Sequence, residues 1–519
     1  MLVGVIAIAA GIAARFWGLE TRTFWVDEAF SSLRISGHTY VQVTALFDGH
    51  VHPATQVASL QETRRGLAAT IASVIHEEPQ RGLVYYVAAS LWSGVFGATI
   101  AAERAFSALV GTIGIAVGFL LGRRAARSPL GGFVLAALIA LSPFQIAYSQ
   151  QVREYSLFAD CILLGAWLLL RALELPNAVR WSAFGVASIF GLYVEPLYVF
   201  ILLAAALVVA SERPLERAKP AGFAVAAGVA LASFIPLAVL NLQAASRTAV
   251  GVSWAGTPYA AQAYVIKWIF NIGATFFDAE LANRWWAIAL VPLLALAAYA
   301  VVDAVRNAGN RDRSSRLALA LSGCTSLPFI LADLVKQAHY EAITRYQVAT
   351  WIGLELALAL ALTAALSSRD TRLRFGSAIA FAFVLACGAT SVVVSRPYPI
   401  WWENNQSIDS AAIDAAIPGF LSPIIIAQRP AAVEVLALGR YLYSHDRLLL
   451  GSDGPFAIDL RSGPYYAFLP DATLKSMLSA HGQIYNVSPP SRSPVPALAR
   501  DPQGLGDPKN ALWKWDLRL

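Results

Sequence analysis

The sequence predicts an α-helical polytopic membrane protein that ends in a small soluble α/β domain. Of its 519 residues, 57% are hydrophobic and only 14% are charged, whereas a soluble protein carries about 25% charged residues. Apolar segments recur along the first 395 residues, and beyond residue 396 the content of Pro, Gly and charge rises. With a mean hydropathy of +0.56, the net charge of +6 predicts nothing about nucleic acid, and we expect no nucleic-acid partner.

Twelve apolar segments approach the roughly 17–25 residues that a membrane-spanning helix needs. They are 2–19, 83–100, 103–122, 129–148, 155–171, 180–194, 196–210, 221–241, 285–305, 317–335, 347–366 and 375–395. The first has the position of a signal peptide, but it lacks a basic start and an A-x-A cleavage site, so we interpret it as a retained anchor.

The short basic connections set the direction of these segments. The loops 123–128, 171–180, 211–220, 306–316 and 367–374 hold 15 Lys and Arg in 45 residues, and such loops belong in the cytoplasm. All five fall inside if the N-terminus is cytoplasmic and segment 83–100 is an embedded juxtamembrane helix. We therefore predict about eleven transmembrane helices, with a twelfth at 83–100 as the alternative, in a bacterial inner (plasma) membrane protein whose C-terminal domain is extracytoplasmic.

We divide the chain into a transmembrane domain, 1–395, and a soluble domain, 396–519. The first includes a long extracytoplasmic loop, 20–102, with juxtamembrane helices, and the stretch YAAQAYVIKWIFNIG in 242–284 predicts an interfacial helix. The tail runs PIIIAQ, RLLLGS, PFAIDL, YYAFLP and QIYNVS predict strands, with helices near 430–443 and 471–481. Cys161, Cys324 and Cys387 lie in apolar segments and predict buried thiols.

Charged residues gather at the external ends of the predicted spans, where the stretch FWVDEAF (24–30) places Asp27 and Glu28 just after the first anchor. Within the spans we expect almost no charge, Asp160 and Asp333 being the exceptions. Ionisable groups at membrane depth cost several kcal/mol unless they are paired or hydrated, so they mark function.

Transfer of a sugar from a lipid phosphate would use carboxylates and arginines together at such a face. Phosphate is a good leaving group, arginines neutralise its charge, and one carboxylate takes the proton of an acceptor hydroxyl. The lipid tail would explain why the site lies at a membrane surface.

The order of several motifs resembles that of the GT-C glycosyltransferases, of the protein O-mannosyltransferase and aminoarabinose-transferase type. FWVDEAFS resembles their W-x-D-E-A motif, ERAFSALVG their R-L-P-S-A-L, SPFQIAYSQQVREYSL their S-P-F-x-x-x-Y-S-Q-E-A-R-x-Y, and TRYQ their P-R-Y-L. EEPQRGLVYYVAASLW resembles their H-P-P-L-Y-Y segment. The matches run from residue 16 to about 350, and the tail matches only as a soluble external domain.

The resemblance implies a polyprenyl-phosphate-linked sugar donor and an inverting transfer to a glycan, lipid or protein acceptor. By position it makes Asp27 the catalytic base, with Glu28 supporting it. The candidate contacts of the donor phosphate are Arg153, Arg345, Arg104 and Lys336. The candidate contacts of the rest of the substrates are His76, Glu78, Tyr148, Gln151, Glu154, Glu195, His339 and Tyr346.

The chain departs from the family pattern in two places. Gln151 stands where the family has an acid after Y-S-Q, which leaves a carboxylate role there to Glu154. PQRG replaces the H-P-P run, so the role of its histidine falls to His76 or Glu78, or is absent. No metal-ligand spacing is present, and a divalent ion (Mg²⁺ or Mn²⁺) stays an alternative to a hydrated loop cluster at these two residues.

Each candidate also has a structural alternative. Asp27 could be a solvated loop acid, and Glu28 could stabilise the first turn of a helix. Arg153 and Arg345 could be interfacial arginines that extend to the headgroups, and Arg104 and Glu195 could form structural ion pairs. At the level of the whole chain, the alternatives are a flippase or transporter of a lipid-linked sugar and an inactive scaffold.

Overall fold

The computed structural model describes residues 2–212, 217–251, 261–278, 288–310, 312–336, 340, 343–397, 422–453, 456, 465–480, 482–486 and 512–517. The chain divides into two compact units, which we describe separately. The membrane unit comprises Met1–Trp17, Glu78–Tyr85 and Arg104–Ser395. The loop-and-tail unit comprises Gly18–Glu77, Tyr86–Glu103 and Arg396–Leu519.

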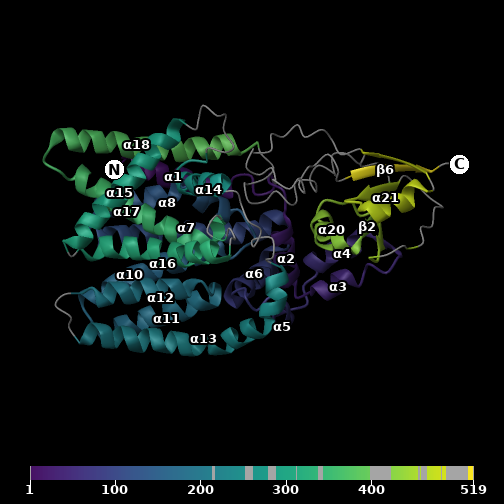
Figure 1. The fold of residues 1–519 in the computed structure, drawn as a ribbon, viewed down its shortest axis with the longest axis horizontal. Coiled ribbons are helices and arrows are strands. Elements are labelled where there is room, and N and C mark those ends of the chain that lie inside the picture. The colour runs from purple at the N-terminus through teal and green to yellow at the C-terminus, as the bar shows by residue number, and fades with distance from the viewer. Residues whose placement is uncertain are drawn as a thin grey trace. The chain divides into compact units, whose positions relative to one another are not determined.

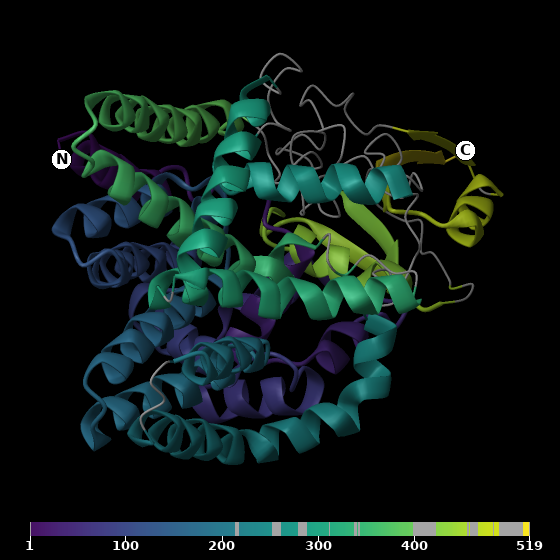
Figure 2. The same cartoon turned by 60° about the vertical axis from the view of Figure 1, so that its left-hand side comes forward.

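The membrane unit is built from helices that lie side by side in both cartoon views (Figure 1, Figure 2). They are α1 (Leu2–Phe16), α7 (Ile100–Ala125), α8 (Pro129–Leu141), α9 (Pro143–Ser149), α10 (Tyr155–Glu174), α11 (Ala178–Val194), α12 (Tyr198–Ala210), α13 (Ala218–Gly251), α14 (Ala261–Ala274), α15 (Leu290–Gly309), α16 (Arg313–Lys336), the 3₁₀ turn η4 (Thr344–Gln347), α17 (Val348–Leu366) and α18 (Thr371–Ser395).

Among the described residues, seven helices are long and apolar enough to cross a membrane, or eight if the bent pair α8–α9 is one span. The chain is therefore a multi-pass membrane protein. Helices α1, α11 and α12 are apolar but shorter, with 15, 17 and 13 residues. Added to the eight, they would give the eleven transmembrane helices expected from the sequence, and that number stays a prediction. Helix α6 (Leu83–Phe96), the predicted juxtamembrane segment, has only 14 residues.

Helix α17 is the central helix of the membrane unit. It packs against α8, α10, α15, α16 and α18, and 89% of its most apolar stretch is buried inside the protein, against 22% for α13. Apart from Glu355, its sequence is largely apolar on every face, as expected for a helix that contacts protein on every side. The three cysteines are buried and form no disulfide, as predicted.

Helix boundaries follow local signals in the sequence. Ser128 precedes Pro129, and its hydroxyl accepts a hydrogen bond from Leu130 N at 3.2 Å; Asn177 caps α11 by accepting from Arg180 N at 3.0 Å. Such caps satisfy amides that have no partner within the helix. Ser142 lies before a proline and is extended, so α8 and α9 meet at a bend of 61°.

The prediction that the spans hold almost no charge besides Asp160 and Asp333 is wrong. Arg15 of α1 and Glu355 of α17 are both fully buried. Arg15 donates from Nη1 to Ala140 O at 2.8 Å and from Nη2 to Ile139 O at 3.0 Å, and Gln145 donates to Glu355 at 3.3 Å. The bend after α8 frees carbonyls that need another donor, which Arg15 supplies. The hydropathy of a segment does not reveal such a need.

The loop-and-tail unit joins the first loop to the C-terminal segment. From the first loop it contains α2 (Val26–Ser36), α3 (Tyr40–Thr44), β1 (Val51–Pro53), α4 (Ala54–Glu62), α5 (Leu67–Glu77) and most of α6. From the tail it contains β2 (Ile424–Gln428), η6 (Arg429–Ala431), α20 (Ala432–Leu438), β3 (Arg447–Gly451), β4 (Tyr465–Phe468), α21 (Ala472–Ser479), β5 (Gly482–Asn486) and β6 (Leu512–Leu517).

Its six-stranded sheet has the order β1-β3-β2-β4-β6-β5. The three inner strands β3, β2 and β4 are parallel, with Ile424 opposite Arg447 and Tyr465, and β2 is a buried apolar run, as parallel strands are. Strand β1 adds antiparallel to β3, so the sheet draws a strand from the first loop. The sequence predicted neither β1 nor β6; the predicted strand PFAIDL lies almost wholly outside the described residues.

Candidate functional site

Arginine side chains and a carboxylate meet in the membrane unit where α10 begins. Arg81 donates to Glu154 Oε1 at 3.0 Å and to the Tyr155 hydroxyl at 3.2 Å. Arg153 lies 3.5 Å from the same carboxylate oxygen, and its guanidinium carbon is 5.5 Å from the centre of the Tyr155 ring. The charge of Arg345 also acts on the Tyr155 phenol. We call Arg81, Arg153, Glu154, Tyr155 and Arg345 the arginine cluster.

The connection between α9 and α10 holds this cluster in place. Gln150 donates from Nε2 to Ala14 O at 2.8 Å and so fastens the connection to the end of α1. The rings of Tyr148 and Tyr155 pack edge to face, with centres 5.1 Å apart. Arg153 and Glu154 are consequently at most 1% exposed, although both are charged.

Glu195 lies in the connection between α11 and α12 and belongs to the same environment. Glu195 is 8% exposed, and this burial raises its pKa to about 8. The negative charge of Glu154 also raises the pKa, whereas the positive charges of Arg81 and Arg153 lower it. At neutral pH it is therefore mostly protonated. Three guanidinium groups, from Arg81, Arg153 and Arg345, and two carboxyl groups act in this region, so it carries excess positive charge, which suits an anion.

Arg345 enters from η4, the 3₁₀ turn before α17. Its guanidinium carbon lies 5.8 Å from the centre of the Tyr346 ring, which stacks on Phe329 at 5.7 Å. The turn is fixed by Thr344, which donates to Asn271 Oδ1 at 2.6 Å and accepts at its carbonyl from the Trp351 indole at 3.3 Å. Arg345 is 8% exposed.

In the loop-and-tail unit, Asp27 and Glu28 occupy the first turn of α2. The Glu28 carboxylate accepts from Trp25 N at 3.4 Å, and Glu28 is fully buried. Glu28 thus makes the helix-start contact that one reading of the sequence expected. Asp27, one position earlier, is only partly buried, and Ser31 donates to its carbonyl at 3.1 Å.

A buried ion pair lies close by in the same unit. Arg440, which follows α20, donates to Glu103 Oε2 at 3.2 Å and lies 3.6 Å from Glu62. Ser32 of α2 donates to the same oxygen of Glu103, and the Arg440 guanidinium stands 5.1 Å from the centre of the Phe24 ring. The ion pair thus links the tail to the helix that carries Asp27.

The other predicted residues fall in varied surroundings. Arg104 and Gln151 are buried in the membrane unit, and Lys336 is exposed at the end of α16. His76 is exposed and its Nδ1 lies 2.7 Å from Ala72 O, while the carbonyl of Glu78 accepts from Arg81 N at 2.9 Å. His339 lies outside the described residues.

No metal site is evident in the described part of the chain. There, no three His, Cys, Asp or Glu side chains gather as metal ligands would. In that part of the chain, neither His76 nor Glu78 belongs to such a group.

The sequence reading missed three members of these clusters. Arg81 stands in the PQRG stretch, where it had counted only as a departure from a motif. Tyr155 was read as the start of a span, and Arg440 lies in the tail, for which no motif exists. For Arg81 and Arg440, the sequence signal was an arginine next to an apolar segment. Arginines in such places are more often interfacial anchors.

Comparison with known proteins supports the fold. No protein-family model matches the sequence, and no curated protein matches it. ArnT from Cupriavidus metallidurans in the apo state is 12% identical, with a TM-score of 0.50 over 93% of this chain and 95% of that one. The same protein bound to undecaprenyl phosphate gives 0.49 over the same shares. The likeness to the apo structure shows a shared fold.

A more distant match is the Archaeoglobus fulgidus oligosaccharyltransferase tethered with an acceptor peptide, which is 11% identical with a TM-score of 0.47. The match covers 87% of this chain but only 63% of that protein.

Proposed function

We propose that the protein transfers a sugar from a polyprenyl-phosphate donor to an acceptor hydroxyl at the extracytoplasmic membrane face, with inversion at the anomeric carbon. The observation that carries the proposal is the arginine cluster. Arg81 and Arg153 lie within 3.5 Å of the Glu154 carboxylate, and the charge of Arg345 acts on the adjacent Tyr155 phenol. Such a charge excess in a buried place binds a phosphate and stabilises it further as it leaves the sugar.

The residues of the membrane unit take the donor in this proposal. Arg81 and Arg153 would hold the phosphate oxygens, and Arg345 would add charge from η4. Glu154 accepts from Arg81 and so orients it, which makes Glu154 a positioning residue. Arg104 and Lys336 stay candidates for the same phosphate, and Tyr148, Gln151, Glu195 and Tyr346 for other parts of the substrates.

In this reaction Asp27 would accept the proton of the acceptor hydroxyl while the oxygen attacks the anomeric carbon and the phosphate departs. Asp27 is partly exposed as a residue, whereas buried Glu28 holds the first turn of α2 and positions it. The W-x-D-E-A resemblance supports the same assignment. The donor sugar and the acceptor, which is a glycan, a lipid or a protein, are left to experiment.

The test is transfer from a panel of labelled polyprenyl-phosphate sugars to acceptors in a membrane extract, with purified wild type and Asp27→Asn. We expect one sugar to be transferred, with a loss of about 10²–10⁴-fold in the variant, the usual contribution of a general base. Asp48→Asn is the matched control, because Asp48 is an acid of the same loop whose carboxylate contacts its neighbours His50 and His52.

Full transfer by Asp27→Asn would remove the base assignment. If neither protein transferred sugar while both bound polyprenyl phosphate, and sealed vesicles showed the lipid moved across the membrane, the flippase alternative would replace the proposal.

A further inference from the structure

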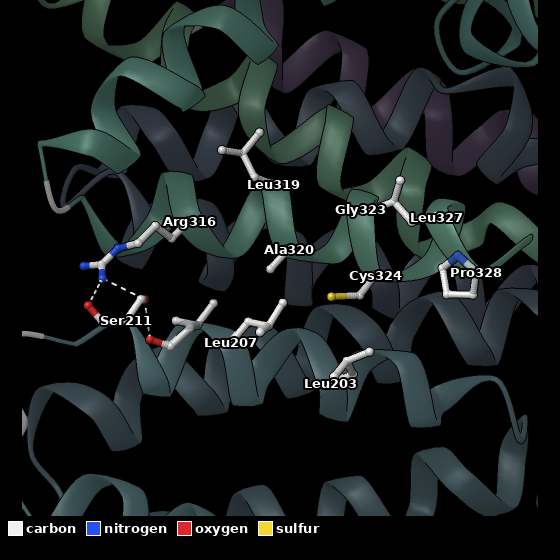
Figure 3. Close-up of a pocket in the computed structure, with 11 residues that line it drawn as sticks. Leu203, Leu207, Ser211, Arg316, Leu319, Ala320, Gly323, Cys324, Leu327 and Pro328 are labelled. Carbon is white, nitrogen blue, oxygen red and sulfur yellow. Dashed lines mark hydrogen bonds between the residues drawn. The ribbon is translucent and has the colours of Figure 1, made fainter. Parts of the chain in front are cut away.

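An elongated groove runs along the membrane unit between α12 and α16. It has a volume of about 510 Å³, and its walls include Leu203 and Leu207 of α12 and Leu319 and Leu327 of α16. Figure 3 shows Leu203, Leu207, Ala320 and Cys324 in the gap between the two helices, with Arg316 at one end and Pro328 at the other. The groove is therefore apolar along its length and charged at one end.

The groove has the length of one lipid chain. From Arg316 to Pro328 the α16 helix rises about 18 Å, at about 1.5 Å per residue. Half the hydrocarbon thickness of a bilayer is about 15 Å, so the groove extends over one leaflet. Leu207 and Leu327 are 53% and 58% exposed, which leaves apolar walls open from the side.

The charged end is built from the connections before α13 and α16. Arg316 donates to Ser211 Oγ at 2.7 Å and to the Ser211 carbonyl. Glu212 accepts from Arg313 Nε at 2.9 Å and lies 3.5 Å from Lys219. The described residues of the two connections and the helix starts that follow them carry a surplus of positive charge. They hold four cations (Arg217, Lys219, Arg313 and Arg316) and two carboxylates (Glu212 and Asp312).

This end is remote from the arginine cluster. Helix α12 starts after Glu195, which belongs to the environment of Arg81 and Arg153, and ends at Ala210. Its 13 residues separate the two ends by about 20 Å at a rise of about 1.5 Å per residue. A lipid phosphate at Arg316 would thus lie about 20 Å along α12 from the proposed donor site.

We propose that this groove binds one acyl chain of an anionic phospholipid whose phosphate lies against Arg316, Arg313 and Lys219. The apolar walls match the chain, and the net positive charge at the end matches the headgroup. The site is independent of the proposed glycosyl transfer, because it takes a membrane phospholipid as a bound component and no reaction is involved.

The test uses the full protein in nanodiscs with a trace of phosphatidylglycerol that carries a photoactivatable acyl chain, and in parallel with the phosphatidylcholine of the same chains. Cross-linked peptides are mapped by mass spectrometry. We expect labelling within 203–211 and 316–328, about fivefold stronger for phosphatidylglycerol, because one favourable surface charge changes affinity by about that factor.

Gly323→Phe fills the groove without moving the helix, because a Cβ at Gly323 meets only Leu327 Cδ1, at 3.9 Å. We expect it to remove the labelling. Gly228→Phe is the matched control, since Gly228 lies on exposed α13 with nothing within 4 Å of its Cβ position. Arg316→Gln should reduce the labelling about fivefold, whereas Arg306→Gln, at the end of α15 and outside the groove, should not.

Equal labelling by the two lipids, or labelling that survives Gly323→Phe, would overturn the proposal. So would competition by polyprenyl phosphate in preference to phosphatidylglycerol, which would make the groove a part of the donor site.

Discussion

Glu195 should make the stability of the protein fall as the pH rises, and Glu195→Gln should remove that dependence. Burial raises its pKa from 4.5 in water to about 8 in the folded protein. Between these values the folded state keeps a proton that the unfolded state has lost. The contribution of Glu195 to the free energy of unfolding is therefore complete below pH 4.5 and is lost as the pH rises past 8. One pKa unit corresponds to about 1.4 kcal/mol.

From pH 5 to pH 8, the free energy of unfolding of the wild type should therefore fall by about 4 kcal/mol relative to Glu195→Gln. The assay is unfolding in detergent, followed by tryptophan fluorescence at half-unit steps of pH. Other groups titrate in the same range, so the difference between the two proteins is the measured quantity. Glu20→Gln, which alters an exposed acid, should run parallel to the wild type. If Glu195→Gln also ran parallel to it, the carboxyl would be ionised in the folded protein and the argument for its burial would fail.

Two substitutions test the packing around the clusters. Gly82→Ala places a Cβ 1.8 Å from the Val194 carbonyl oxygen, so we expect the protein to lose about 1–3 kcal/mol of stability. Because neighbouring Arg81 must move, the variant should also bind polyprenyl phosphate more weakly in a pull-down. Gly376→Ala, with open space around it, should change neither stability nor binding. Arg440→Met leaves Glu103 buried without its cation and should lower the free energy of unfolding by about 3–5 kcal/mol in a denaturant titration. The double variant with Glu103→Gln should regain most of that stability. If the double variant were as unstable as Arg440→Met, the pairing would be contradicted.

The sequence predicted the features that depend on local composition. The apolar segments are helices, and the stretch in 242–284 that was predicted as an interfacial helix contains helix α14. Four of the five tail runs lie within the described residues as strands. Each depends on periodicity or hydropathy over a few residues, which single-sequence reasoning captures. Strand β1 has three residues and gains its partner from Arg447–Gly451, nearly 400 residues later, so no local pattern could announce it.

The sequence predicted which charged residues belong to the candidate site better than it predicted which of them pair with one another. Arg153, Glu154 and Glu195 were singled out because they are charged at the ends of apolar segments, and the structure brings them together. Arg81 has the same property, yet the motif comparison directed attention to a histidine that the chain lacks. Which arginine meets which carboxylate depends on how the segment before α6, which carries Arg81, packs against the start of α10. The sequence alone does not determine that packing.

The charges that the sequence reading overlooked inside the spans have a part in building the site. Arg15 satisfies two carbonyls at the end of α8, and Gln150 at the end of α9 donates to Ala14 O, one residue before Arg15. The end of α1 is thereby fixed to both sides of the bend that leads to Arg153. A guanidinium buried at membrane depth is stable only where such acceptors meet it. The bend and the arginine therefore require each other, and together they set where the connection that carries Arg153 and Glu154 begins.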